Sequence, residues 1–147
     1  MVADIDRSRR EETDRLGAEW TTPAKAMVAA VDVLVPCALG GVLDHDVVGR
    51  LQAPTIVGAA NNQLASADVA DLLREHDILW APDFVANAGG IVNISVEFEP
   101  GGYAPERAKA KTEEIGDTLR AIFDDAEASG TTPLAAATAR AERNLAR

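Results

Sequence analysis

Short apolar segments rich in β-branched residues alternate, along the first 80 residues, with segments that carry helix signals. The apolar segments are 2–5, 31–35, 55–57 and 78–80, and the second and the last are followed closely by a proline. Strands that are apolar along their whole length are typical of a parallel sheet covered on both faces. Helices between such strands favour right-handed crossovers. The sequence therefore predicts an α/β fold with a doubly wound parallel sheet, and 147 residues suit one domain.

Helix signals occupy the segments between the predicted strands. Residues 8–16 are charged and compatible with a helix that Gly17 closes in a left-handed conformation. Asp44 is predicted to cap a short helix ending near residue 51, and Ser66 is predicted to cap the helix that follows it.

The last third of the chain has a different character. Apolar residues recur at three- and four-residue steps across residues 105–128, which predicts one long helix with a single apolar stripe. Gly130 is expected to end this helix. Thr132 and Pro133 then predict a second helix, with threonine as the cap and proline in the first turn. We interpret the apolar stripe as core packing.

Composition excludes several classes of partner. Fourteen basic and 24 acidic residues give a formal charge of −10, and an acidic surface repels nucleic acid and anionic membranes. The same charge also serves solubility alone. The sequence shows no signal peptide and no apolar run long enough to span a bilayer. Cys37 is the single cysteine, so no internal disulfide forms, and we expect a cytoplasmic protein.

Three predicted strands are followed by loops of unusual composition. The loops are 36–41, 59–63 and 83–90, and they are rich in small residues and asparagine. Parallel strands bring their carboxyl ends to one edge of a sheet, where ligands bind in open α/β folds. Small residues allow a flat ligand to approach the backbone, and asparagine offers both a donor and an acceptor. The other interpretation, that asparagine and glycine are ordinary turn residues, stays equally open.

Other candidate residues have two interpretations each. Asp4 ends the first predicted strand, where dinucleotide-binding folds place an acid that accepts from ribose hydroxyls, yet no glycine-rich turn precedes it. It is equally consistent with a solvated acid. His45 and His76 have no spacing that implies a metal pair or a catalytic dyad with Cys37. We therefore predict no metal site and interpret Cys37 as a small residue in a tight loop.

Three motifs carry a family resemblance. PCALGGVL, GAANNQLA and ILWAPDFVANAGGIVN occur in the order and at the spacing found in NAD-dependent amino-acid dehydrogenases. The chain resembles the C-terminal half of the leucine, valine and phenylalanine branch of the glutamate dehydrogenase superfamily. VADID, at residues 2–6, is similar to the family's second Rossmann strand with its ribose-binding acid. The resemblance implies NAD as cofactor and reversible oxidative deamination of an L-amino acid to a 2-oxo acid and ammonia.

The resemblance also implies roles for individual residues. Asp4 would bind the adenosine ribose, and Gly89 and Gly90 would open the helix that follows the last loop. The residues implied to contact the cofactor are Asp4, Cys37, Ala38, Ala60, Asn61, Asn62 and Asn87. Those implied to contact the substrate are Asn62, Ile91 and Ile94. The β-branched Ile91 and Ile94 would narrow the pocket, which favours valine, leucine or isoleucine over phenylalanine.

The resemblance is partial, and this shapes the expected function. The family's catalytic lysine and aspartate belong to an N-terminal domain that these residues do not match, and the first Rossmann strand with its phosphate loop is also unmatched. We therefore expect an incomplete Rossmann-like domain at 1–98, a helical segment packing on it at 99–147, and an inactive, truncated chain. A sheet left with an open edge predicts a homo-oligomer. The alternative is a non-catalytic remnant that serves as a nucleotide-binding or assembly module.

Overall fold

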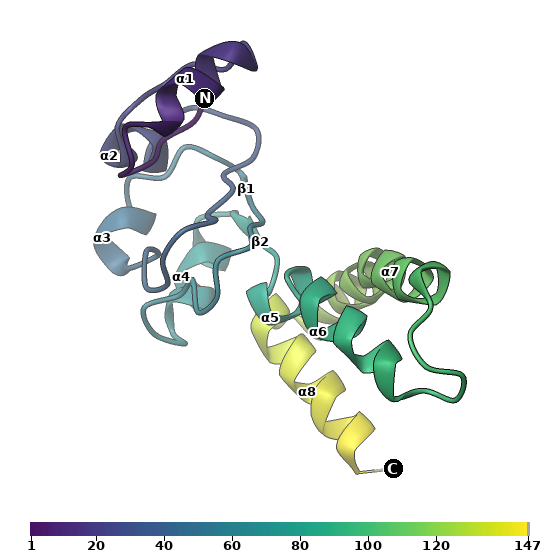
Figure 1. The fold of residues 1–147 in the computed structure, drawn as a ribbon. Helices are drawn as coiled ribbons and strands as arrows, with labels where there is room; N and C mark the ends of the chain where they lie inside the picture. The colour runs from purple at the N-terminus through teal and green to yellow at the C-terminus, as the bar shows by residue number, and fades with distance from the viewer. Residues whose placement is uncertain (147) are drawn as a thin grey trace.

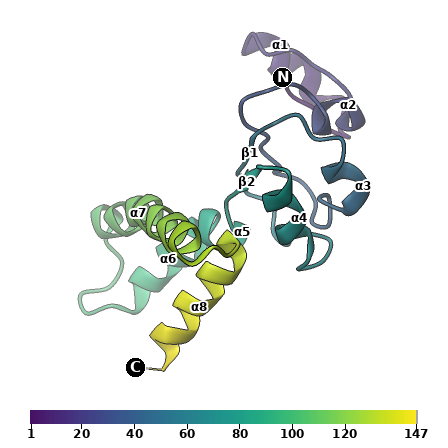
Figure 2. The same ribbon diagram turned by 180° about the vertical axis from the view of Figure 1, so that it is seen from behind.

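The computed structural model describes residues 1–146 and is mostly helical, with 51% helix and 6% strand. Figure 1 shows that the elements before α5 gather in one lobe and that α5 to α8 form a second lobe. The view from behind in Figure 2 shows the same division, with the two termini far apart in different lobes. The elements are α1 (Arg9–Arg15), α2 (Pro23–Met27), α3 (His45–Val48), β1 (Thr55–Ile56), α4 (Val69–Glu75), β2 (Leu79–Trp80), α5 (Asp83–Ala86), α6 (Gly89–Ser95), η1 (Val96–Phe98), α7 (Pro105–Ser129) and α8 (Pro133–Leu145).

The sheet is parallel, as predicted, but smaller than the sequence suggests. Strands β1 and β2 pair in parallel over two residues each. The predicted strand at 31–35 contributes one parallel bridge, between Leu34 and Ile56. Pro36 and Pro54 flank this bridge, and neither has an N–H with which to extend the ladder. The large doubly wound sheet expected from these segments is therefore reduced to short pairings.

The predicted strand at 2–5 is also reduced to a single bridge. Val2 pairs in parallel with Trp20. Two residues later, the side chain of Asp4 accepts a hydrogen bond from the backbone N–H of Asp6 at 2.8 Å. A side chain that bonds to the backbone two residues on turns the chain away from an extended path. The strand therefore ends at Asp4.

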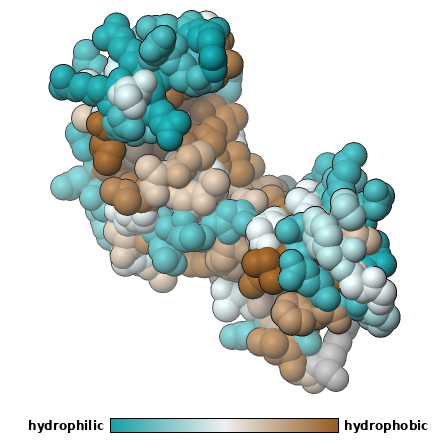
Figure 3. Space-filling model, viewed as in Figure 1, coloured by the Kyte–Doolittle hydropathy of each residue, from teal (hydrophilic) through white to brown (hydrophobic). Residues whose placement is uncertain are grey.

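One face of the sheet is packed and the opposite face is open. Leu34, Ile56 and Trp80 are buried on the first face. Because side chains alternate along a strand, their neighbours belong to the opposite face, where Val33, Val35 and Leu79 are 43%, 56% and 43% exposed. Figure 3 shows hydrophobic side chains exposed over the strand region, while the surface over α1 is hydrophilic.

Two groups of buried side chains form the core. The first, which we call the strand cluster, consists of Leu34, Leu43, Val48, Ala53, Ile56, Val69, Leu73 and Trp80. The second, which we call the helix cluster, joins α7 to α8 and consists of Ile122, Ala126, Ala136 and Ala137. The apolar stripe of α7 therefore packs inside the molecule through its residues Ile122 and Ala126, as predicted.

Most of the predicted helix boundaries are confirmed. Gly130 closes α7 with φ of 65°, and Gly17 follows α1 with φ of 70°. The side chain of Thr132 accepts from the N–H of Ala135 at 3.2 Å at the start of α8. Asp44 caps α3 by accepting from the N–H of Val47 at 2.7 Å.

The predicted cap at Ser66 is wrong. Helix α4 begins at Val69, and its N-cap is Asp68, two residues after Ser66, with no side-chain cap bond. Ser66 instead offers its backbone carbonyl, which accepts from the N–H of Val69 at 3.2 Å. A turn before the helix thus takes the place of the side-chain cap. No helix within residues 1–146 is both long enough and apolar enough to cross a membrane.

Candidate functional site

The loops that follow the strand segments meet through their backbones. The N–H of Ala60 donates to the carbonyl of Pro36 at 3.0 Å, and the N–H of Gly41 donates to the carbonyl of Asn62 at 2.7 Å. Loops 36–41 and 58–63 are thus joined at both ends. Parallel strands place these loops at the same edge of the sheet, which is where ligands bind in open α/β folds.

Two glycines permit this close approach. A Cβ at Gly40 would lie 2.6 Å from the carbonyl oxygen of Asn61, and a Cβ at Gly58 would overlap the backbone of Pro36. No side chain fits at either position without moving the backbone of the facing loop. The small residues that the sequence analysis associated with ligand approach therefore have, at these two positions, a role in packing one loop against the other.

An asparagine pair joins loop 58–63 to the end of α5. The side-chain nitrogen of Asn87 donates to the side-chain oxygen of Asn61 at 2.6 Å and lies 3.4 Å from the carbonyl of Ala59. Asn61 is exposed and Asn87 is half-buried. Because both N–H groups of Asn87 point at oxygens, its own side-chain oxygen remains as an acceptor. Asn61 correspondingly presents its NH₂ group as a donor.

Asn62 has an unusual backbone conformation. Its φ of 53° lies in the left-handed region, which asparagine adopts more readily than most residues. This conformation lets the carbonyl of Asn62 accept from Gly41 while its side chain stays exposed.

A buried polar network supports the loop from below. Gln63 is fully buried, and its side-chain NH₂ donates to the carbonyls of Gly58 and Ala60 at 2.9 and 3.0 Å. Its side-chain oxygen accepts from the indole N–H of Trp80 at 3.1 Å. The carboxylate of Asp83 accepts from the backbone N–H of Gln63 at 2.6 Å. The Asp83 carboxylate thus connects the start of α5 to loop 58–63.

The roles of Gln63 and Trp80 do not follow from the local pattern, which places Gln63 in a turn-rich loop and Trp80 in a strand. One signal does point to Gln63, a long polar side chain directly before Leu64 in a loop whose neighbours are small. A buried amide must find partners for its donors and its acceptor, and the Trp80 indole offers a matching donor.

The other predicted residues are spread over the molecule. Cys37 and Ala38 are exposed in loop 36–41, and Ala60 is buried beside the asparagine pair. Ile91 and Ile94 are 71% and 52% exposed on α6. Gly89 begins α6, directly followed by Gly90.

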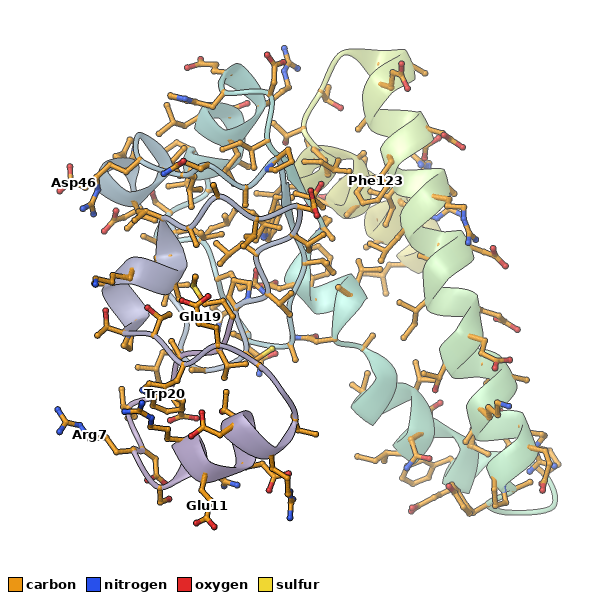
Figure 4. All side chains as sticks on the ribbon, turned by 90° about the horizontal axis from the view of Figure 1, so that it is seen from above. Arg7, Glu11, Glu19, Trp20, Asp46 and Phe123 are labelled. Atoms are coloured by element: carbon orange, nitrogen blue, oxygen red, sulfur yellow. The ribbon has the colours of Figure 1, made fainter. Side chains whose placement is uncertain are left out.

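Asp4 lies apart from the three loops. It lines an open hollow together with Arg7, Arg10, Trp20 and Lys25, and none of the lining residues comes from those loops. Figure 4 shows that Arg7 and Glu11 extend from this N-terminal segment away from the ribbon. Across residues 1–146, no group of three or more histidine, cysteine or acidic side chains is arranged to hold a metal ion.

Comparison with known proteins identifies related chains. The sequence profile of the Glutamate/Leucine/Phenylalanine/Valine dehydrogenase family matches residues 2–144. L-tryptophan dehydrogenase of Nostoc punctiforme is 42% identical over 147 residues, which cover 99% of this chain and 41% of that protein. Valine dehydrogenase of Streptomyces coelicolor is 42% identical over 97% of this chain and 39% of its own length.

Solved structures agree with the sequence comparison. The crystal structure of the Nostoc punctiforme L-tryptophan dehydrogenase superposes with a TM-score of 0.91, covering 97% of this chain and 43% of the other. A hetero-hexameric glutamate dehydrogenase from Thermus thermophilus shares the fold with a TM-score of 0.61 at 22% identity. This chain spans about two fifths of the length of the curated relatives. It belongs to the Glutamate/Leucine/Phenylalanine/Valine dehydrogenase family.

Proposed function

We propose that this chain forms the NAD-binding part of an amino-acid dehydrogenase that acts on apolar, branched-chain L-amino acids. The observation that carries the proposal is the Asn61–Asn87 pair, which sits where the loops after the strands meet. The bond between the two amides leaves one NH₂ donor, on Asn61, and one carbonyl acceptor, on Asn87. A primary carboxamide, such as that of nicotinamide, offers the complementary acceptor and donor. The donor set therefore fits the nicotinamide half of NAD.

The proposal assigns the remaining residues the roles that the family resemblance implies. Cys37, Ala38 and Ala60 would line the cofactor groove, Asn62 would hold the nicotinamide ribose or the substrate head group, and Asp4 would accept from the adenosine ribose. NAD, when bound, supplies the acceptor for the hydride that leaves the amino acid. The residues of this chain bind and orient both ligands. The lysine and aspartate implied by the family resemblance belong to the part of the relatives that this chain does not match.

The proposed substrate class depends on two residues of α6. Ile91 and Ile94 are spaced three residues apart on this helix and are exposed, so both can contact an apolar side chain brought against them. Neither carries charge, which disfavours an acidic substrate. We propose valine, leucine or isoleucine, because β-branched side chains leave a narrow space.

We also propose a division of the chain, with residues 1–98 as a partial Rossmann-like domain and residues 99–147 as a helical segment that packs on it. Helices α6 and α7 contact each other directly, which supports packing across that boundary. The parallel pairing of the segments at Leu34, Ile56 and Trp80 supports the parallel sheet of such a domain.

A titration tests the cofactor assignment. NADH and AMP are titrated separately into the chain by calorimetry, because AMP lacks the nicotinamide half. We expect Asn87→Ala to weaken NADH binding by about tenfold, as loss of one hydrogen bond predicts, and to leave AMP binding unchanged. Asn144→Ala, an exposed asparagine on α8, is the matched control. The assignment fails if the wild type does not bind NADH, or if Asn87→Ala binds it equally well.

The open face of the sheet supports a second candidate function, that of an assembly module. Val33, Val35 and Leu79 are exposed together, and parallel sheets are normally covered on both faces. Light scattering over a hundredfold range of protein concentration distinguishes the two. A monomer throughout, with NADH bound, supports the dehydrogenase part alone, whereas a concentration-dependent oligomer that Val35→Lys abolishes supports assembly.

A further inference from the structure

Three buried polar side chains are bonded to the segments that carry the asparagine pair. Gln63 is 0%, Trp80 3% and Asp83 6% exposed. Within residues 1–146, no buried side-chain nitrogen or oxygen lacks a hydrogen-bond partner. Buried polar groups that are fully bonded hold one arrangement, because any other leaves a donor or acceptor without a partner.

Gln63 fixes the shape of its own loop. Its side-chain NH₂ donates to two carbonyls of that loop, at Gly58 and Ala60, and its oxygen accepts from Trp80 at the end of β2. The loop is therefore closed on itself and attached to the strand. Asn61 lies inside the closed segment, so its backbone position follows from these bonds.

Asp83 connects this closed loop to helix α5. Its carboxylate accepts from the backbone N–H of Gln63 at 2.6 Å. Its backbone carbonyl accepts from the N–H of Asn87 at 2.8 Å, one helical turn later. One residue therefore bonds to the segment that carries Asn61 and also to Asn87 itself.

We propose that Asp83 is a positioning residue that holds Asn61 and Asn87 at hydrogen-bond distance and in one orientation. The distance between the two amides depends on how loop 58–63 packs against α5. The bond that the Asp83 carboxylate accepts from the Gln63 N–H is a buried hydrogen bond between that loop and α5. What the pair binds rests on the proposed function above. The positioning itself is a property of the unliganded chain and is tested without a ligand.

The test is a nuclear magnetic resonance measurement of the side-chain NH₂ signals of a ¹⁵N-labelled chain. In the wild type, the two protons of Asn87 face different oxygens and are expected to have well-separated shifts. Asn61→Ala removes the nearer oxygen and defines the signature of the broken pair. We expect Asp83→Ala to reproduce that signature and to increase hydrogen exchange at the Gln63 amide by about tenfold. Asp83→Asn keeps an acceptor oxygen and should restore the wild-type signal.

A matched variant separates positioning from a general loss of stability. Asp44, in the lobe that holds Gln63, also accepts a hydrogen bond from a backbone N–H, that of Val47 at 2.7 Å. Asp44→Ala should lower stability to a similar extent and leave the Asn87 signal unchanged. The proposal is overturned if Asp83→Ala keeps the wild-type Asn87 signal, or if Asp44→Ala changes it equally.

A milder variant covers the case in which Asp83→Ala does not fold. Asp83→Glu keeps the carboxylate and moves it by one methylene. We expect a change of the Asn87 signal in the same direction as Asn61→Ala, and smaller. An unchanged Asn87 signal in folded Asp83→Glu would count against the proposal.

Binding then links positioning to function. If the wild type binds NADH, Asp83→Ala should weaken NADH binding by about tenfold and leave AMP binding unchanged. Asp83→Asn should bind NADH like the wild type. If the wild type binds no NADH, the cofactor assignment fails, and the resonance measurements still decide whether Asp83 positions the pair.

Discussion

The strand cluster and the helix cluster differ in the size of the side chains that they bury. In the first, Ile56, Leu43 and Val69 are large and 0% exposed. In the second, Ile122 packs mainly against alanines, and the neighbouring α6 exposes both Ile91 and Ile94. The asparagine pair is connected to the strand cluster through the hydrogen bond between Gln63 and Trp80, whereas the residues proposed for the substrate side chain lie on the exposed helix. The polar half of the proposed site therefore lies against a core of large side chains, and its apolar half is not enclosed.

The largest expected effect comes from equal truncations in the two clusters. Ile56→Ala leaves a cavity among large, buried neighbours, and we expect it to lower the free energy of unfolding by about 4 kcal/mol. Ile122→Ala should cost about 2 kcal/mol, because small neighbours on two helices can close part of the space. Urea denaturation measures both. Equal losses would remove the distinction between the clusters.

Two glycines, one inside α7 and one at its C-terminal cap, test the backbone conformation in the second lobe. Gly130 has φ of 65°, so Gly130→Ala should destabilise by about 1 kcal/mol through backbone strain. Gly116 lies inside the helix, where a Cβ would meet only the end of Arg120 at 3.9 Å. Gly116→Ala should therefore stabilise by about 0.8 kcal/mol. Thermal melting of both variants shows whether each change lowers or raises stability. A change of stability in the same direction for both variants would contradict the assigned backbone conformations.

Helix caps offer one probe in each region. Asp44 accepts its cap bond at 2.7 Å in the strand region and Thr132 at 3.2 Å at the start of α8. Each alanine variant should lose about 1 kcal/mol, with Asp44→Ala the larger loss because its bond is shorter and charged. Chemical denaturation resolves the pair. A larger loss for Thr132→Ala would show that the α8 end is better anchored than its cluster suggests.

The smallest expected effect is a pH dependence confined to the helical lobe. A hydrogen bond from Lys111 on α7 lowers the pKa of Glu99 below its ordinary value of 4.5, and the charge of Arg107 acts in the same direction. Because the folded pKa is lowered, the stabilisation is present above pH 4.5 and is lost as the pH falls through the folded pKa. Glu99→Gln should flatten this part of the stability curve. Melting temperatures between pH 3 and 6 measure the difference, and an unchanged slope would contradict it.

Local signals in the sequence predict local structure well. Gly17, Gly130, Thr132 and Asp44 act at the helix ends where their chemistry places them, because a cap depends on a few neighbouring residues. Ser66 does not, since a backbone turn satisfies the same N–H group. The strands are shorter than their apolar runs because pairing depends on distant partners and on prolines that interrupt the ladder.

The site could be predicted only as a set of loops. Alternation of strands and helices implies that loops 36–41, 59–63 and 83–90 meet, and the first two of them do so through backbone bonds. Sequence alone could not show that Asn87 donates to Asn61, or that Gln63 is buried, because both depend on how loop 58–63 packs against residues distant in the sequence. Gly40 and Gly58 allow loops 36–41 and 58–63 to approach closely, through contacts that no local pattern encodes.

Cys37 gives the chain an experimental handle. It is the single cysteine, it is exposed, and it lies in the loop that is bonded at both ends to the loop bearing Asn61. A thiol-reactive fluorophore will therefore attach at one position without any engineered mutation, beside the proposed cofactor groove. Its emission would report ligand arrival in real time, and its reaction rate with and without NADH would measure how far the groove is shielded.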